Sequence, residues 1–342
     1  MTAIDWDTVQ RTSSRFTGDY PLAGTYHEHR YALQAPGLVA RASDLVAEAT
    51  GLDLPGVADV AVVSRDAWVS ANTASFSRLL APLEEAAGLV SNSSFGAKAT
   101  GVQLGAVLGF MSKRVLGQYE LVLPTGDDRA GDTVMFVGAN VLSMERDHQF
   151  RPTNFRFWVA LHECAHRAQF VGIPWMREYF LSLVDELIAA EGDRTGRISL
   201  IADKLRRARE RGEDPIGDQG IIGLLATEQQ QTVIDRVQAL MSLLEGHGHV
   251  VMDRVGADHI VDVRRMSRVL TARRKDPRTA AIMRLIGIEM KMRQYEDGAR
   301  FIAEVERIAS WDALSMAWES PDALPTLDEI HDPGAWLSRM AG

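Results

Sequence analysis

The sequence contains a single cysteine, Cys164, among 342 residues. One cysteine excludes a disulfide within the chain, and it excludes a metal site built only from cysteine ligands. A reducing cytoplasm is therefore the expected location of the protein. The start of the chain carries acidic residues and no apolar segment, so it is not expected to act as a secretory signal.

The sequence also lacks an apolar run long enough to cross a membrane. Its most lipid-like stretch, residues 99–112, is shorter than the roughly 20 residues that a spanning helix needs. An excess of basic residues is absent as well: the formal net charge is -9, which argues against nucleic acid or a membrane surface as a partner. The basic run at residues 204–213 is interleaved with acids and is typical of a solvated helix face.

Apolar residues make up 46% of the sequence, which is enough for a large core. Residues 59–68 begin with a β-branched run that predicts a short strand or the lead-in to a helix. The runs at 118–124 and 132–140 are separated by a turn-like segment and predict a hairpin directly before residues 158–170. Further along, apolar residues recur at intervals of three and four, which predicts helices at 178–190, 197–211, 227–255 and 279–308.

These patterns predict a mostly α fold of the α+β class, with a small β-sheet followed by a large helical C-terminal part. We expect one domain, residues 1–342, with two lobes at about 1–172 and about 173–342. The first 35 residues are polar, and they are expected to be irregular with some helical character. A helix should follow over residues 35–52, ended by Gly51. The proline-rich end of the chain is expected to run over the surface.

Glycines recur at every fourth position of one predicted helix, at Gly101, Gly105 and Gly109. This spacing places all three on one face. Glycine costs a helix about 1 kcal/mol relative to alanine, so a row of them needs a reason. The simplest is that another backbone packs closely against this face.

The stretch WVALHECAHRAQF, residues 158–170, contains the pattern H-E-x-x-H at His162, Glu163 and His166. Helix-forming residues fill the stretch, and Gly172 is a plausible end, so we predict a helix over residues 155–170. The two histidines then lie one turn apart on one face, where one tetrahedral Zn²⁺ can bind both. From its position, Glu163 can reach a zinc-bound water and act as its general base.

A third ligand must come from elsewhere, and LLEGHGHVVMD at residues 243–253 is the best candidate segment. Glu245, His249 and Asp253 share one face of a helix in this segment. We favour Glu245, because glutamate followed by glycine downstream of H-E-x-x-H resembles the third-ligand segment of glutamate-type zincins. His249 is the alternative ligand, or it contacts the reacting groups. A glutamate that only caps a helix, beside exposed histidines, also remains open.

The remaining histidines and the cysteine carry weaker signals. His27 and His29 are two residues apart, a spacing that does not suit one helix face, so we expect an exposed loop. Cys164 projects away from both motif histidines and is expected to be a small core residue.

Several blocks of the chain together resemble a bacterial family of zincin-like proteins. These blocks are FWVALHECAHRAQFVGIPWMREYF, VLGQYELVLP, FVGANVLSMER, MSLLEGHGHVVMD and GIEMKMRQYEDGARF, and the resemblance spans about residues 59–336. Family members are catalogued as uncharacterised hydrolases or as proteins associated with biosynthesis of a deazaflavin coenzyme. The resemblance implies a zincin-like fold, the motif roles for His162, Glu163 and His166, and a ligand role for Glu245.

The sequence therefore predicts a zinc-dependent hydrolase, most simply peptidase-like, acting on a peptide or a small amide. Tyr179, Tyr295 and His249 are candidate donors to the oxyanion that forms during hydrolysis. Two alternatives remain open: a non-catalytic zinc protein that serves as a binding partner or scaffold, and a small-molecule amidase of cofactor metabolism. The sequence does not predict an oligomeric state.

Overall fold

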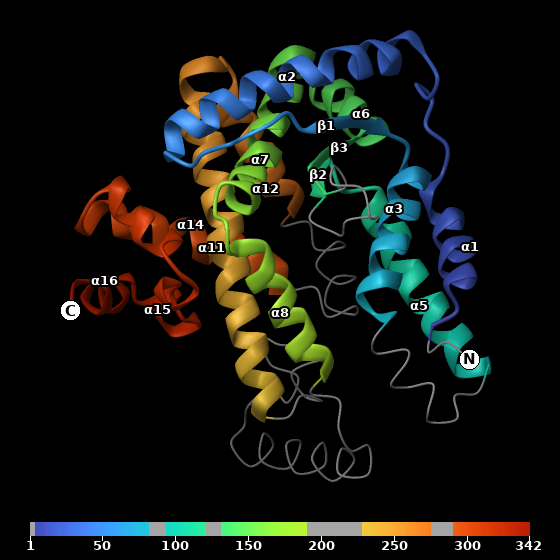
Figure 1. Ribbon diagram of the computed structural model, residues 1–342. Helices are drawn as coiled ribbons and strands as arrows, with labels where there is room; N and C mark the ends of the chain where they lie inside the picture. Colours follow the sequence, from blue (N-terminus) through green and yellow to red (C-terminus); the bar gives the residue numbers. More distant parts are fainter. Residues whose placement is uncertain (1–3, 82–93, 121–130, 190–227, 275–289) are drawn as a thin grey trace. The chain divides into compact units, whose positions relative to one another are not determined.

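The computed structural model describes residues 4–81, 94–120, 131–189, 228–274 and 290–342 (Figure 1). The chain divides into two compact units. The first consists of residues 1–174 and 251–266, and the second of residues 175–250 and 267–342. No helix within the described ranges has both the length and the apolarity needed to cross a membrane.

In the first unit, helices surround one small sheet whose strand order is β1-β3-β2. Strand β3 (Thr133–Val137) is central and buried from Val134 onward, and it pairs in parallel with β1 (Asp59–Val63). On its other side it pairs antiparallel with β2 (Gly117–Glu120), in a register that sets Gly117 opposite Phe136. The predicted pairing of the two runs is confirmed over these residues, and residues 121–130 lie outside the described part. Among the described strands, β2 is an edge.

The prediction that the second run stays extended to residue 140 was wrong. The strand ends at Val137, and helix α6 (Gly138–His148) precedes the motif helix. The buried side chain of Asn140 donates to the carbonyl oxygens of Ser112 at 2.7 Å and Val115 at 2.6 Å. These two bonds anchor the first turn of α6, which hydrophobic patterning alone does not reveal.

The N-terminal region is more regular than predicted. It contains α1 (Trp6–Thr17) and α2 (Tyr26–Thr50), and α2 continues through an internal proline at Pro36. His27 and His29 are exposed, but they lie in the first turn of α2 and not in a loop. The predicted end of the helix at Gly51 is confirmed: this residue has a φ of 68° and donates its N–H to the carbonyl of Ala47.

The glycine face predicted for residues 99–112 does pack closely against another backbone. It belongs to α5 (Ser94–Ser112), which lies beside α1 in Figure 1. A Cβ atom on Gly105 would lie 2.6 Å from the carbonyl oxygen of Val9, and one on Gly109 would lie 2.8 Å from that of Ser13. Only glycine permits this separation between α1 and α5. Helix α3 (Arg65–Leu79) packs against both.

The second unit is helical in its described residues. Helix α8 (Met176–Ala189) matches the prediction for 178–190, while the helix predicted at 197–211 and the basic run at 204–213 lie outside the described residues. Helix α11 (Glu228–His259) is one continuous helix of 32 residues, which extends into the first unit, and α12 (Val263–Arg274) follows it. Helix α14 (Met290–Ile308) is described over the second part of the segment predicted at 279–308.

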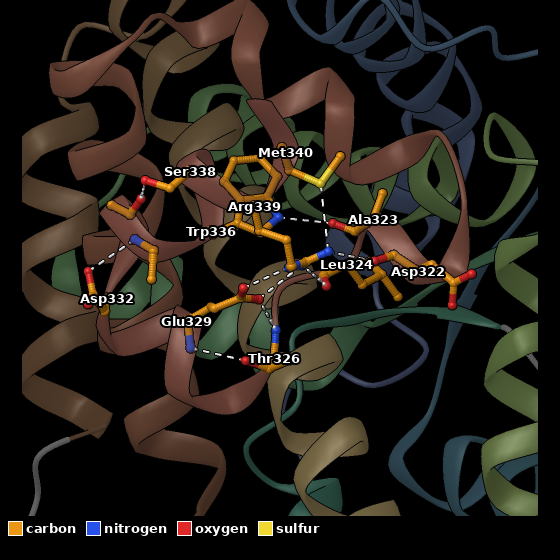
Figure 2. Close-up of polar contacts among 12 residues, drawn as sticks. Asp322, Ala323, Leu324, Thr326, Glu329, Asp332, Trp336, Ser338, Arg339 and Met340 are labelled. Atoms are coloured by element: carbon orange, nitrogen blue, oxygen red, sulfur yellow. Dashed lines mark hydrogen bonds and ion pairs between the residues drawn. The ribbon is translucent and has the colours of Figure 1, made fainter. Parts of the chain in front are cut away.

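The C-terminal segment folds into four short helices, and hydrogen bonds and a buried tryptophan hold them together. These are η1 (Trp311–Trp318), η2 (Pro321–Ala323), α15 (Leu327–His331) and α16 (Pro333–Ala341). Figure 2 shows Arg339 between the carboxylate of Glu329 and the backbone carbonyls of Asp322 and Leu324. Trp336 is fully buried and donates its indole N–H to the carbonyl of Ala323 at 2.9 Å.

Candidate metal centre

The motif lies on α7 (Pro152–Val171), which packs against α2 and β2. The helix starts slightly earlier than predicted because Pro152, with its fixed φ, occupies the first turn. Its predicted end is confirmed, since Gly172 donates its N–H to the carbonyl of Ala168 at 2.8 Å. Most of the helix is buried, whereas His162 and His166 are half-buried. A buried helix therefore holds both imidazoles at a partly accessible position.

The two imidazoles converge on one point. Nε2 of His162 and Nε2 of His166 are 3.2 Å apart, and the two rings are nearly perpendicular at 81°. Two nitrogens bound to one tetrahedral zinc at about 2.0–2.1 Å are separated by roughly 3.3–3.4 Å. The spacing of the two Nε2 atoms thus fits a shared metal ion of this size.

Glu163 follows His162 directly on the same helix. It is buried, and its side chain lies against the first residue of β2: a Cβ atom on Gly117 would be 2.6 Å from Oε1 of Glu163. Burial raises the pKa of Tyr31 on α2 well above its usual range, and the carboxylates of Glu145 and Glu163 add to this effect. The buried side chain of Glu163 therefore packs against the edge strand β2, and its charge is within range of Tyr31 on α2.

Glu245 lies on α11 and is buried. Within the described part of the chain, His162, His166 and Glu245 form a group whose potential ligand atoms all lie within 4.8 Å of one another. Two helical turns after Glu245, Asp253 accepts a hydrogen bond at 3.3 Å from the indole N–H of Trp158, which precedes His162 by one turn of α7.

The glycine after Glu245 has a packing role. A Cβ atom on Gly298 of α14 would overlap the carbonyl oxygen of Ser242 and would lie 3.0 Å from Cα of Gly246. The backbones of α11 and α14 therefore touch at the turn that carries Glu245. This contact explains why a glycine, Gly246, follows Glu245, and it holds this turn of α11 against α14.

The other predicted site residues have different surroundings. His249 is half-buried one turn after Glu245, and it is outside the group with close ligand atoms. Tyr179 on α8 lies near Arg236, which lowers its pKa while burial, the larger effect, raises it. Arg236 precedes Glu245 by nine residues, or roughly 13 Å along α11. Tyr295 lies on α14, but its side chain is outside the described part.

Two buried polar residues at the end of the motif helix were not predicted. Gln169 is fully buried, and its Oε1 lies 2.9 Å from Nδ1 of His166. Arg167 is also buried and forms a bidentate ion pair with Asp132, with both N–O distances at 2.7 Å. The position of Gln169, three residues after a histidine on one helix, is a signal that the sequence already contains.

The prediction for Cys164 as a core residue is confirmed. It is fully buried, and the hydroxyl of Ser43 lies 3.5 Å from its sulfur. Burial raises the pKa of the thiol to about 12. A thiol with so high a pKa is almost entirely protonated at neutral pH, and the thiolate is the reactive form of cysteine.

The donor set fits zinc. Two imidazole nitrogens and a carboxylate are ligands that zinc commonly takes in catalytic sites, and the spacing of the nitrogens agrees with its bond lengths. A mostly helical protein with an H-E-x-x-H helix beside a small sheet is of the zincin-like class.

The chain belongs to the zincin-like metallopeptidase family, whose model matches residues 4–337. A solved structure from Chloroflexus aurantiacus, described as "a putative hydrolase with a novel fold", is similar to the chain at 29% sequence identity and a TM-score of 0.74. The match covers 99% of each chain. No curated protein matches the sequence. The family and this neighbour support a hydrolase-type function, and the association with deazaflavin coenzyme biosynthesis stays a prediction.

Proposed function

We propose that the protein is a zinc-dependent hydrolase of the peptidase type. The observation that carries the proposal is the grouping of His162, His166 and Glu245 within 4.8 Å, with the two histidine Nε2 atoms 3.2 Å apart. Three protein ligands leave one position of a tetrahedral ion for water or substrate, which is the arrangement of catalytic rather than structural zinc.

In this proposal His162 and His166 hold the ion through Nε2, and Glu245 holds it through its carboxylate. When bound, zinc would supply a Lewis acid that lowers the pKa of a water towards 7 and polarises a carbonyl oxygen. Glu163 is adjacent to His162 in the chain but is not in the ligand group, so its carboxylate serves as the base. It takes a proton from the attacking water and gives it to the leaving nitrogen.

The edge strand β2 supports a peptide as the substrate. It begins at Gly117, where the Glu163 side chain packs, and it pairs with β3 on one side only among the described strands. An extended peptide that adds to such an edge places its backbone carbonyls at fixed intervals along the strand. A peptide bond aligned by β2 would pass Glu163, whereas a small amide would need no such edge.

Metal analysis is the test of this proposal. The wild-type protein should contain about one zinc per chain, and Glu245→Gln should lose most of it, since a neutral amide is a poor zinc ligand. Asp258→Asn is a matched control, because Asp258 is an exposed acid on the same helix. A wild-type protein that takes up no zinc when zinc is supplied would refute the proposal.

The role of Glu163 separates an enzyme from a zinc protein without activity. Glu163→Gln should keep its zinc and its fold while hydrolysis of a peptide library falls by at least about 10²-fold. If the wild-type protein binds zinc but cleaves neither peptides nor small amides, the non-catalytic zinc protein becomes the better description.

A further inference from the structure

A buried glutamine contacts the ring nitrogen of His166 that is not directed at His162. Oε1 of Gln169 lies 2.9 Å from Nδ1 of His166, while Nε2 of the same ring lies 3.2 Å from His162. Gln169 is fully buried on α7, three residues after His166. The two nitrogens of this ring therefore have separate partners.

We propose that Gln169 is a positioning residue that selects the tautomer of His166 in which Nδ1 carries the hydrogen. An amide oxygen can only accept a hydrogen bond, so Nδ1 must donate to it. A neutral imidazole has one N–H, which leaves the lone pair on Nε2. That lone pair is the one directed at the point shared with His162, where a metal would bind. The inference therefore rests on the proposed zinc site for its function.

The alternative tautomer would work against metal binding. With its hydrogen on Nε2, His166 would direct an N–H at the nitrogen of His162, 3.2 Å away, and no lone pair would remain for an ion. Partners of this kind on metal-binding histidines fix ring orientation, and their loss weakens metal binding by about 10–100-fold. The residue three positions after His162 is Ala165, whose side chain has no acceptor, so α7 offers His162 no side-chain contact of the same spacing.

Nuclear magnetic resonance of the metal-free protein tests the tautomer directly. Long-range proton–nitrogen correlations of ¹⁵N-histidine protein at about pH 8.5, two units above the ordinary histidine pKa, show which ring nitrogen carries the hydrogen. The His166 signals are assigned by their loss in His166→Gln. We expect the Nδ1–H form in the wild type. In Gln169→Met, which keeps the side-chain length but replaces the amide oxygen with a weakly accepting sulfur, the population should shift towards Nε2–H.

Zinc affinity, measured by competition with a chromophoric chelator, gives the second readout. Gln169→Met should bind zinc about 10–100-fold more weakly than the wild type. Gln169→Glu keeps an acceptor at the same place and should retain both the Nδ1–H form and the wild-type affinity or better. It also replaces Gln169→Met as the decisive variant if the latter does not fold.

The outcomes separate this inference from the proposed function. An unchanged tautomer and unchanged affinity in Gln169→Met, or loss of the Nδ1–H form in Gln169→Glu, would overturn the role of Gln169 while zinc binding stands. A shift to Nε2–H in Gln169→Met in a protein that binds no zinc would support tautomer selection and refute the zinc hydrolase.

Discussion

The carboxylate of Glu163 occupies space that any side chain at Gly117 would need. A Cβ atom at Gly117 would lie 2.6 Å from Oε1 and 2.8 Å from both Cγ and Cδ of Glu163. Since three atoms of a buried side chain are involved, Glu163 cannot avoid a methyl group at position 117 by a small rotation. Gly117 thus sets the position of the proposed base relative to His162.

Gly117→Ala should therefore reduce hydrolysis without removing zinc. A displacement of a reacting group by about 1 Å can cost on the order of 10²-fold in rate. We expect kcat to fall by about that factor, while metal content by elemental analysis stays at the wild-type level. Loss of zinc in this variant would instead mean that the alanine disturbs the ligand helix, and an unchanged kcat would argue against Glu163 as the base.

Local geometry explains which parts of the site the sequence could predict. His162 and His166 share a face because they are four residues apart on one helix. This spacing can be read from the sequence alone. The contact of Gln169 with His166 is local in the same sense. The contact of Glu163 with Gly117 joins residues 46 positions apart in the sequence, and only the sheet topology brings them together.

The N-terminal helix shows why hydrophobic patterning missed part of the fold. The inner face of α1 includes Thr8, Thr12, Ser13 and Thr17, all of them buried. The hydroxyl of Ser13 donates to the carbonyl oxygens of Val9 at 2.8 Å and Gly105 at 3.0 Å. Small polar side chains fill the narrow space against the glycine face of α5, and Val9 is the one apolar residue among the buried residues of α1.

The ion pair between Arg156 and Glu145 connects the motif helix to α6 and should contribute strongly to stability. Both side chains are almost fully buried, and their two N–O distances are 2.7 and 2.8 Å. Glu145→Gln leaves a buried guanidinium without its counter-charge, which costs about 3–5 kcal/mol in the free energy of unfolding. Urea denaturation followed by circular dichroism measures this loss.

An exposed ion pair on α6, the helix that carries Glu145, provides the control. Arg146 and Asp147 have side chains that are 56% and 53% exposed. Asp147→Asn should change the free energy of unfolding by less than about 1 kcal/mol. Equal effects of Asp147→Asn and Glu145→Gln would contradict the assignment of Arg156 and Glu145 as a buried, stabilising pair.

The α1–α5 contact predicts opposite effects for two glycine-to-alanine changes in helices. In Gly105→Ala, the new methyl group meets the Val9 carbonyl at 2.6 Å and Cβ of Thr12 at 2.7 Å, so α1 must move. Overpacking of this kind costs about 1–3 kcal/mol. A Cβ atom on Gly37 of α2 would have no neighbouring atom within 4 Å, and Gly37→Ala should stabilise the protein by up to about 1 kcal/mol. Thermal unfolding of both variants checks the two signs.

Burial of Cys164 predicts slow thiol chemistry in the folded protein. With a pKa of about 12, the thiol is almost entirely protonated at pH 8, and the thiolate is the reactive form. A disulfide reagent that absorbs on reaction should label the native protein very slowly and label it rapidly in denaturant. Rapid labelling of the native protein would show that the α2–α7 contact around Cys164 opens readily.

The raised pKa of Cys164 also predicts how the free energy of unfolding depends on alkaline pH. In the unfolded chain the thiol ionises at its ordinary pKa of 9.0, whereas the folded protein holds the proton to about 12. Below pH 9 both states are protonated, so the full stability is present. Above pH 9 the folded state binds more protons than the unfolded state, and the free energy of unfolding falls by about 1.4 kcal/mol per pH unit until about pH 12. Cys164→Ala has no ionising thiol, so its stability should decline less steeply than that of the wild type between pH 9 and 10.5. Parallel slopes for the two proteins in urea titrations would refute the raised thiol pKa.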